Sequence, residues 1–182
     1  MIKFEKVSKY ADVDLIAPER KTTDSGGYDL AVAEDIIIPS FDKHWSALLR
    51  NQYNSRKPMT LNEIAAATKA TGAKPTFVST GMKCYMETGQ YLKLVPRSSC
   101  PLKHWLILAN SEGIIDRDYV DNPDNEGEIF LQFINLSPFD IQLRRGDMIG
   151  QGIICNYIIT DDDAATGKRI GGFGSTSEAA NG

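Results

Sequence analysis

The chain has 182 residues, a net charge of −4, 42% hydrophobic residues and 24% charged residues. This length and composition indicate one globular domain with an additional segment, and they exclude collagen-like and disordered proteins. The acidic balance argues against direct nucleic-acid binding, and no apolar run reaches the ~20 residues that cross a bilayer. We expect no signal peptide, because no apolar stretch follows the first residues. The three cysteines form no CxxC pair, so we expect reduced thiols and no zinc site.

Most of the chain predicts short β-strands separated by turns. In chain order, the apolar or alternating runs are 36–38, 82–86, 91–95, 105–108, 128–135, 141–144 and 148–159. In one of them, Ile129, Leu131 and Phe133 share a face, as residues of a half-buried strand do. Many short strands at this spacing are typical of a sandwich or barrel, so residues 1–159 predict one β domain.

Residues 42–75 interrupt the β pattern. Apolar residues recur at helical spacing from Trp45 to Tyr53, and Thr60–Glu63 has the pattern of a capping box before a second apolar face. We therefore expect two short helices, with Pro58 between them and Pro75 ending the segment, as an insertion between two strands.

The last residues, 160–182, are mainly small, polar or acidic. Ile170 and Phe173 are the only large apolar residues of this segment. Such a segment cannot build a core of its own. We expect a mobile arm that becomes ordered only against another surface.

Five short segments contain more glycine and polar residues than packing requires. In the first, Gly26–Leu30, Asp29 follows a glycine pair and either approaches a metal or belongs to a turn that enters a strand. In the second, Arg97, Ser98 and Ser99 follow a strand and a proline. Arginine and exposed backbone amides suit phosphate oxygens, and the alternative is a polar turn with an exposed arginine.

The third segment, Asn110–Tyr119, brings Asp116 to the end of a strand behind two isoleucines. Asp116 and Asp118 point to one face if the strand continues. A partly buried carboxylate beside a polar site serves as a general base for a water molecule. Two solvated aspartates in a surface turn would have no such role, and the segment alone leaves both interpretations open.

The fourth and fifth segments are rich in glycine. The fourth, 145–151, has a Gly-Asp turn signal and ends on Gln151, and the alternative to a binding role is a hairpin with a kinked strand. The fifth, 168–176, combines glycines with two cations, two hydroxyl groups and one phenylalanine. Its backbone amides suit phosphates, although it is not a Walker loop, and the alternative is a flexible tail.

In this order, the five segments resemble those of one family, the trimeric deoxyuridine triphosphatases (dUTPases), across residues 24–176. The resemblance implies an all-β fold, a jelly-roll-like β-sandwich, assembled as a homotrimer with shared active sites. It implies Mg²⁺-dependent hydrolysis of dUTP to dUMP and pyrophosphate in the cytoplasm, or in the host cytoplasm if the source is viral. The 160–182 arm would close over a neighbouring active site.

The resemblance also implies a role for each matched residue. Asp116 matches the catalytic base, which activates a water that attacks the α-phosphorus, and Asp29 matches an aspartate placed near the metal. Tyr119 matches the aromatic ring that packs under deoxyribose and leaves no room for a ribose 2′-hydroxyl. The other matched residues would bind the substrate: Arg97, Ser98, Ser99, Asn110, Gly113, Ile115, Gln151, Arg169, Phe173, Gly174, Ser175 and Thr176.

The sequence departs from the family pattern at several positions. Residues 120–126 intervene before Gly127, where the family usually continues at once. Either Lys168 or Arg169 takes the place of the arm's arginine, and we favour Arg169 for its bidentate geometry with phosphate. Trp105 stands where a glycine is common.

Three other functions compete with this prediction. A deoxycytidine triphosphate deaminase of the same fold shares the Arg97–Ser99 stretch, although the 115–119 run and the arm favour the triphosphatase. A regulatory protein would use the 42–75 insertion as a docking surface for a protein partner. A purely structural jelly roll would leave the cations and glycines of the arm unexplained.

Overall fold

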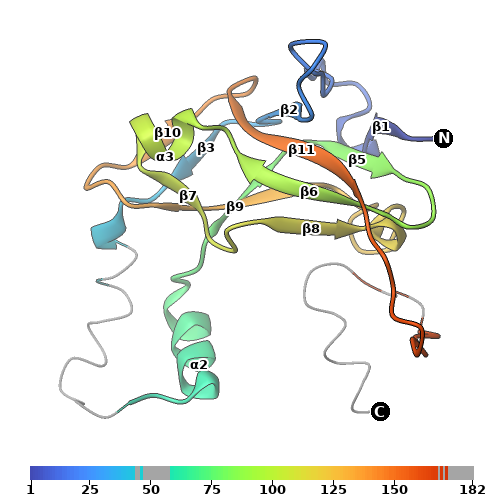
Figure 1. The fold of residues 1–182 in the computed structure, drawn as a ribbon. Coiled ribbons are helices and arrows are strands. Elements are labelled where there is room, and N and C mark those ends of the chain that lie inside the picture. Colours follow the sequence, from blue (N-terminus) through green and yellow to red (C-terminus); the bar gives the residue numbers. More distant parts are fainter. Residues whose placement is uncertain (44–45, 47–57, 168, 170, 172–182) are drawn as a thin grey trace.

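The computed structural model describes residues 1–43, 46, 58–167, 169 and 171, and it is built mainly of β-strands (Figure 1). The strands are β1 (Lys3–Lys6), β2 (Tyr28–Ala31), β3 (Ile36–Ile38), β4 (Thr76–Ser79), β5 (Met82–Tyr85), β6 (Gln90–Pro96), β7 (Leu106–Leu108), β8 (Gly113–Asp116), β9 (Phe130–Asn135), β10 (Ile141–Leu143) and β11 (Met148–Asn156). Helical elements include η1 (Ser8–Tyr10), α2 (Leu61–Thr71), α3 (Ser99–His104) and η2 (Arg117–Tyr119). No helix in the described ranges is long and apolar enough to cross a membrane.

Two antiparallel sheets form the body of the fold. The larger sheet has the strand order β2-β11-β6-β8, and the smaller has the order β4-β9-β7. β11 lies at the centre of the larger sheet, because it pairs with β2 on one side and with β6 on the other. Two ribbons, β1-β5 and β10-β3, extend this body. The predicted all-β fold class is thus confirmed.

The hydrophobic core lies between the two sheets. Leu131 and Phe133 of β9 pack in one buried cluster with Leu92 and Leu94 of β6, and Ile129 joins them. Burial alternates along β9, so the predicted shared face of Ile129, Leu131 and Phe133 is confirmed. Strands that bury one face against the opposite sheet in this way define a β-sandwich.

The predicted strands are present, but some of their ends differ. The run 148–159 stops at Asn156, and the residues beyond it are exposed. The run 105–108 begins at Leu106, because Trp105 adopts φ 56° and ψ 23°, in the left-handed region. The turn at Gly146 joins strands of different sheets, so the hairpin alternative for the fourth segment is wrong. Helix α3 was not predicted, since six residues that include a proline have no clear helical period.

The 42–75 insertion lies between β3 and β4, as predicted. Its second helix, α2, begins with the expected capping box between Thr60 and Glu63 and ends at Gly72, whose φ is 69°. No residue of α2 is buried, and Figure 1 shows the helix projecting away from the sheets. The predicted first helix, from Trp45 to Tyr53, lies largely outside the described residues.

Candidate active site

Asp116 is the last residue of β8, the edge strand of the larger sheet. β8 pairs with β6, so that Asp116 lies opposite Tyr91 and Gly113 opposite Leu94. A Cβ atom at Gly113 would lie 3.0 Å from the Leu94 side chain, so the glycine allows the two strands to pack closely. After Asp116 the chain turns into η2 instead of continuing as a strand. The strand does not continue beyond Asp116, so the condition under which Asp116 and Asp118 would share a strand face is not met.

The two aspartates are nevertheless brought together by Arg169 of the arm. The Arg169 guanidinium donates to Asp116 Oδ2, and its Nε donates to Asp118 Oδ1 at 2.9 Å. The same guanidinium lies 5.9 Å from the centre of the Tyr119 ring. Only 15% of the Arg169 side chain is exposed, against 54% for each aspartate. The arm residue is thus held by two carboxylates and a ring.

Tyr119 is buried below these charged groups. Its hydroxyl donates to the Glu128 carbonyl at 2.9 Å and accepts from Asn125 Nδ2 at 2.7 Å. Burial raises the pKa of Tyr119 above its ordinary value, so the phenol stays protonated at neutral pH. A neutral ring fixed at its hydroxyl end provides a rigid apolar floor beside Asp116.

A cavity of about 130 Å³ opens on the β8 side of the sandwich. The predicted substrate residues Asn110, Gly113 and Ile115 line it, together with Leu94, Leu108, Ile114, Phe130, Leu131 and Gln132. Three residues that the resemblance assigns to substrate binding are thus brought to one hollow. Its lining combines apolar side chains with a few polar groups, as small-molecule sites do.

Asp29 of β2, Gln151 of β11 and Arg97, which directly follows β6, form a second cluster. Asp29 is 3% exposed, and its Oδ1 accepts from Gln151 Nε2 at 2.8 Å. Arg97 Nη2 lies 3.7 Å from the other oxygen, Oδ2, which is buried without a hydrogen-bond partner among the described residues. Gly27 leaves space for Gln151, since a Cβ there would lie 3.2 Å from its side chain. The first, second and fourth segments therefore meet in space.

The two clusters do not meet within one chain. Asp116 lies opposite Tyr91 of β6, whereas Gln151 lies opposite Val95. Four residues along a strand correspond to about 13 Å, and β8 and β11 flank β6 at about 5 Å each. The Cα atoms of Asp116 and Gln151 are therefore about 16 Å apart in a single chain.

The remaining predicted site residues lie either next to Arg97 or outside the described residues. Ser98 and Ser99 lie at the start of α3, next to Arg97. Lys168, Phe173, Gly174, Ser175 and Thr176 lie outside the described residues. One residue that the sequence did not single out contacts the site: Asn125 Nδ2 donates to the Tyr119 hydroxyl at 2.7 Å. The intervening 120–126 segment was the only signal that pointed towards Asn125.

Comparison with known proteins identifies the family. The dUTPase family model matches residues 63–177, which is more than half of the chain. The deoxyuridine 5′-triphosphate nucleotidohydrolase of Lactococcus lactis subsp. lactis is 34% identical over 175 residues, covering 95% of either chain. This chain belongs to the dUTPase family.

Solved dUTPase structures share the fold. The dUTPase from Streptococcus mutans matches with a TM-score of 0.66 and 33% identity, over 87% of this chain and 98% of that chain. The dUTPase from phage phi11 of S. aureus matches with a TM-score of 0.56, over 91% of this chain and 96% of that chain. Its 16% identity makes it a comparison of folds alone. The predicted jelly-roll-like sandwich and the predicted enzyme class, a dUTP diphosphatase, are confirmed.

Proposed function

We propose that the protein hydrolyses dUTP in the cytoplasm by attack of water on the α-phosphorus, with Asp116 as the general base. The observation that carries this proposal is the placement of Asp116, half-exposed at the end of β8, close to the Tyr119 ring and beside the cavity lined by Asn110 and Gly113. Asp116 takes a proton from the water as its oxygen bonds to phosphorus. The bond to the bridging oxygen breaks, and pyrophosphate leaves from dUMP. No covalent intermediate with the protein is required.

Base and sugar are selected on the Asp116 side of the site. Backbone groups between Asn110 and Tyr119, including those of Gly113 and Ile115, pair with the uracil edge, while Phe173 of the arm covers the ring. The Tyr119 ring lies under deoxyribose and excludes a 2′-hydroxyl. Its burial and its two hydroxyl hydrogen bonds support this role, because a fixed ring cannot move aside for a larger sugar.

The phosphates are held by cations and hydroxyl groups. Arg97, Ser98, Ser99 and Gln151 form one side, and the arm supplies Arg169 or Lys168 with Gly174, Ser175 and Thr176. Without substrate, Arg169 is paired with the carboxylates of Asp116 and Asp118. A triphosphate offers Arg169 a stronger bidentate partner, and its transfer to the phosphates frees Asp116 to accept a proton.

The Asp29 cluster fits Mg²⁺ as the cofactor. No group of three or more acidic, histidine or cysteine side chains that would enclose a metal occurs in the described part of the chain. A single buried carboxylate oxygen without a hydrogen bond, as in Asp29, matches the preference of Mg²⁺ for substrate phosphates, waters and one or two carboxylates. Asp29 would act on the ion directly or through water. The bound ion supplies charge neutralisation for the triphosphate.

The active site is assembled from several copies of the chain in a homotrimer. The separation of about 16 Å between the Cα atoms of Asp116 and Gln151 supports this arrangement, because a neighbouring copy can bring the two clusters closer together than one chain does. In the single chain, Arg169 of the arm contacts Asp116 and Asp118 of its own copy. In the trimer, the 160–182 arm leaves these contacts and closes over the site of a neighbouring subunit. The shared site explains why the arm adds nothing to the core of its own domain.

A protein partner at the 42–75 insertion is a second proposal. Leu61 and Ile64 of α2 are exposed, and the helix buries no residue against the sandwich. An apolar helix face without a partner marks an interaction site. Loss of dUTP hydrolysis is not required for this role, so the two functions are compatible.

The proposed reaction is tested by incubating the protein and Mg²⁺ with dUTP, dCTP, dTTP or UTP, while pyrophosphate, nucleotides and ammonia are measured. We expect pyrophosphate from dUTP alone, and its loss in Asp116→Asn. The matched control is Asp12→Asn, the same change at an exposed position in the turn after η1. Ammonia from dCTP would support the deaminase alternative, and turnover of UTP comparable to dUTP would refute the role of Tyr119.

A further inference from the structure

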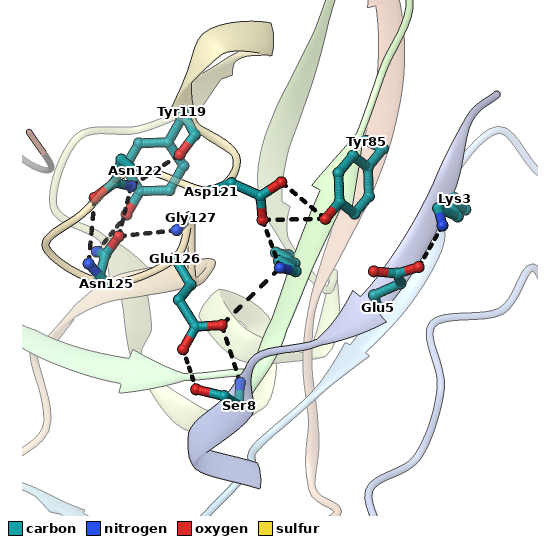
Figure 2. A network of polar contacts seen from close by, with 11 residues as sticks. Lys3, Glu5, Ser8, Tyr85, Tyr119, Asp121, Asn122, Asn125, Glu126 and Gly127 are labelled. Carbon is teal, nitrogen blue, oxygen red and sulfur yellow. Dashed lines mark hydrogen bonds and ion pairs between the residues drawn. The ribbon is translucent and has the colours of Figure 1, made fainter. Parts of the chain in front are cut away.

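The loop of residues 120–127, between η2 and β9, is a folded polar network and not a loose connection (Figure 2). Its outer side is tied to β5 and to η1. Asp121 accepts hydrogen bonds from Lys83 and from the Tyr85 hydroxyl, at 2.5 and 2.9 Å. Glu126 accepts from the backbone amide of Ser8 at 3.1 Å and from its hydroxyl. These contacts fix the loop relative to β5 and η1.

The inner side of the loop is directed at Tyr119. Asn122 Nδ2 donates to the Tyr119 carbonyl at 2.8 Å and to Asn125 Oδ1 at 2.7 Å. Asn125 Oδ1 also accepts from the Gly127 amide at 3.1 Å, and Asn125 Nδ2 donates to the Tyr119 hydroxyl at 2.7 Å. In Figure 2, Asn122 and Asn125 lie beside Tyr119, away from the Ser8 end of the loop.

The loop closes on Tyr119 with no space to spare. Gly127 has φ 81°, and a Cβ atom there would lie 2.6 Å from Val120 Cα and 2.8 Å from the Tyr119 carbonyl oxygen. The Tyr119 ring is thus held at both ends: its backbone by Asn122 and its hydroxyl by Asn125. The Tyr119 hydroxyl in turn donates a hydrogen bond to the Glu128 carbonyl at 2.9 Å.

One of these contacts is not needed to hold the loop closed. The backbone amides of the loop donate hydrogen bonds to Asn125 Oδ1 and to Asn122 Oδ1, whereas Asn125 Nδ2 donates to the side chain of Tyr119. A hydrogen bond that fixes only the hydroxyl end of a ring sets the tilt of that ring. A small change in tilt decides whether a sugar with one more oxygen fits above it.

We propose that Asn125 is a positioning residue, which fixes the Tyr119 ring so that the site discriminates deoxyribose from ribose. This inference rests on the proposed function, in which Tyr119 lies under the sugar. Asn125 acts through Tyr119 and touches no substrate atom. The loop of residues 120–127, which the family pattern does not require, is then part of the sugar selection of this chain.

The test compares kcat/KM for dUTP with kcat/KM for UTP in the full-length protein. Asn125→Ala removes the N–H that donates to the Tyr119 hydroxyl, together with the oxygen that Gly127 and Asn122 use. We expect the dUTP-to-UTP ratio to fall about fivefold, the factor that corresponds to one hydrogen bond. In a Tyr119→Phe background, which has no hydroxyl, Asn125→Ala should change the ratio by less than twofold, and this difference separates the hydroxyl contact from the loss of the loop contacts.

The matched control is Asn135→Ala. Asn135 is also buried, and it donates to the Ile38 and Phe139 carbonyls at 3.2 and 2.6 Å, far from Tyr119 in sequence and sheet. This variant should unfold at lower urea concentration and keep the wild-type dUTP-to-UTP ratio. An equal fall of the ratio in Asn135→Ala would show general loosening and would overturn the proposal.

The other outcomes also decide the question. A folded Asn125→Ala protein with an unchanged ratio would overturn the role of Asn125 and leave dUTP hydrolysis intact. If the wild-type protein does not hydrolyse dUTP, the proposed function itself fails. Calorimetric binding of dUMP and UMP by the same variants would then decide whether Asn125 sets the sugar preference.

Discussion

Replacing Gln151 by glutamate tests whether Asp29 and Gln151 are held together as the structure shows. Gln151 donates to Asp29 Oδ1 at 2.8 Å, and Asp29 is 3% exposed. Gln151→Glu removes this donor and places two carboxyl groups in contact. Two such groups share one proton, because both cannot stay ionised at this distance.

The cost follows from the proton that the folded protein must take up. Keeping a carboxyl of ordinary pKa near 4 protonated at pH 7 costs about 4 kcal/mol, since each pH unit corresponds to 1.36 kcal/mol. The Arg97 guanidinium, 3.7 Å from Asp29 Oδ2, offsets part of this cost by attracting the remaining charge. We therefore expect Gln151→Glu to lose about 3 kcal/mol at pH 7 and to recover about 1.4 kcal/mol per pH unit down to pH 5.

The assay is urea unfolding of wild type and variant between pH 5 and 8, at one protein concentration because assembly changes apparent stability. Gln142→Glu, the same change at an exposed position of β10, is the control and should remain within about 0.5 kcal/mol of wild type. A Gln151→Glu protein as stable as wild type at pH 7, or with a pH-independent deficit, would refute the contact between Asp29 and Gln151.

Three further changes test other parts of the structure. Burial raises the pKa of Glu128, so the folded chain holds this proton more tightly than the unfolded chain does. The free energy of unfolding therefore falls as the pH rises above the ordinary value of 4.5. Glu128→Gln should flatten this fall in urea unfolding between pH 4 and 8. Trp105→Gly should raise the free energy of unfolding by about 1 kcal/mol, because Trp105 has φ 56° and its side chain is exposed; an unchanged or lower value would mean that the indole is buried in the assembly. Arg169→Ala should lower kcat/KM for dUTP by about 10- to 100-fold, whereas Arg169→Lys should retain part of the activity; an unaffected Arg169→Ala would assign the phosphate contact to Lys168.

Local patterns in the sequence predicted much of the fold. The alternation over 128–135 predicted the buried face of β9, and the Thr60–Glu63 pattern predicted the start of α2. Both signals depend on residues within a few positions of each other. Trp105 stands where the family pattern has glycine, and its backbone adopts the left-handed region that glycine favours.

Such local patterns do not predict contacts between residues far apart in the sequence. The sequence singled out Asp29 and Gln151 separately, but their contact depends on the pairing of β2 with β11, more than a hundred residues apart. After Asp116 the chain turns into η2 and the strand does not continue, but Arg169 forms ion pairs with both Asp116 and Asp118. The role of Asn125 required the folded path of the loop, because only there does its amide meet the Tyr119 hydroxyl.

We propose that dUTP is hydrolysed at a site built from Asp116 of one chain and Arg97 of another. Mixing two inactive variants, Asp116→Asn and Arg97→Ala, under conditions that exchange subunits tests it directly. Each variant carries the residue that the other lacks. We expect dUTP hydrolysis to return to about a quarter of the wild-type rate, the share of sites with both intact residues in a random mixture. A mixture that exchanges subunits and stays as inactive as its two components would contradict the shared site.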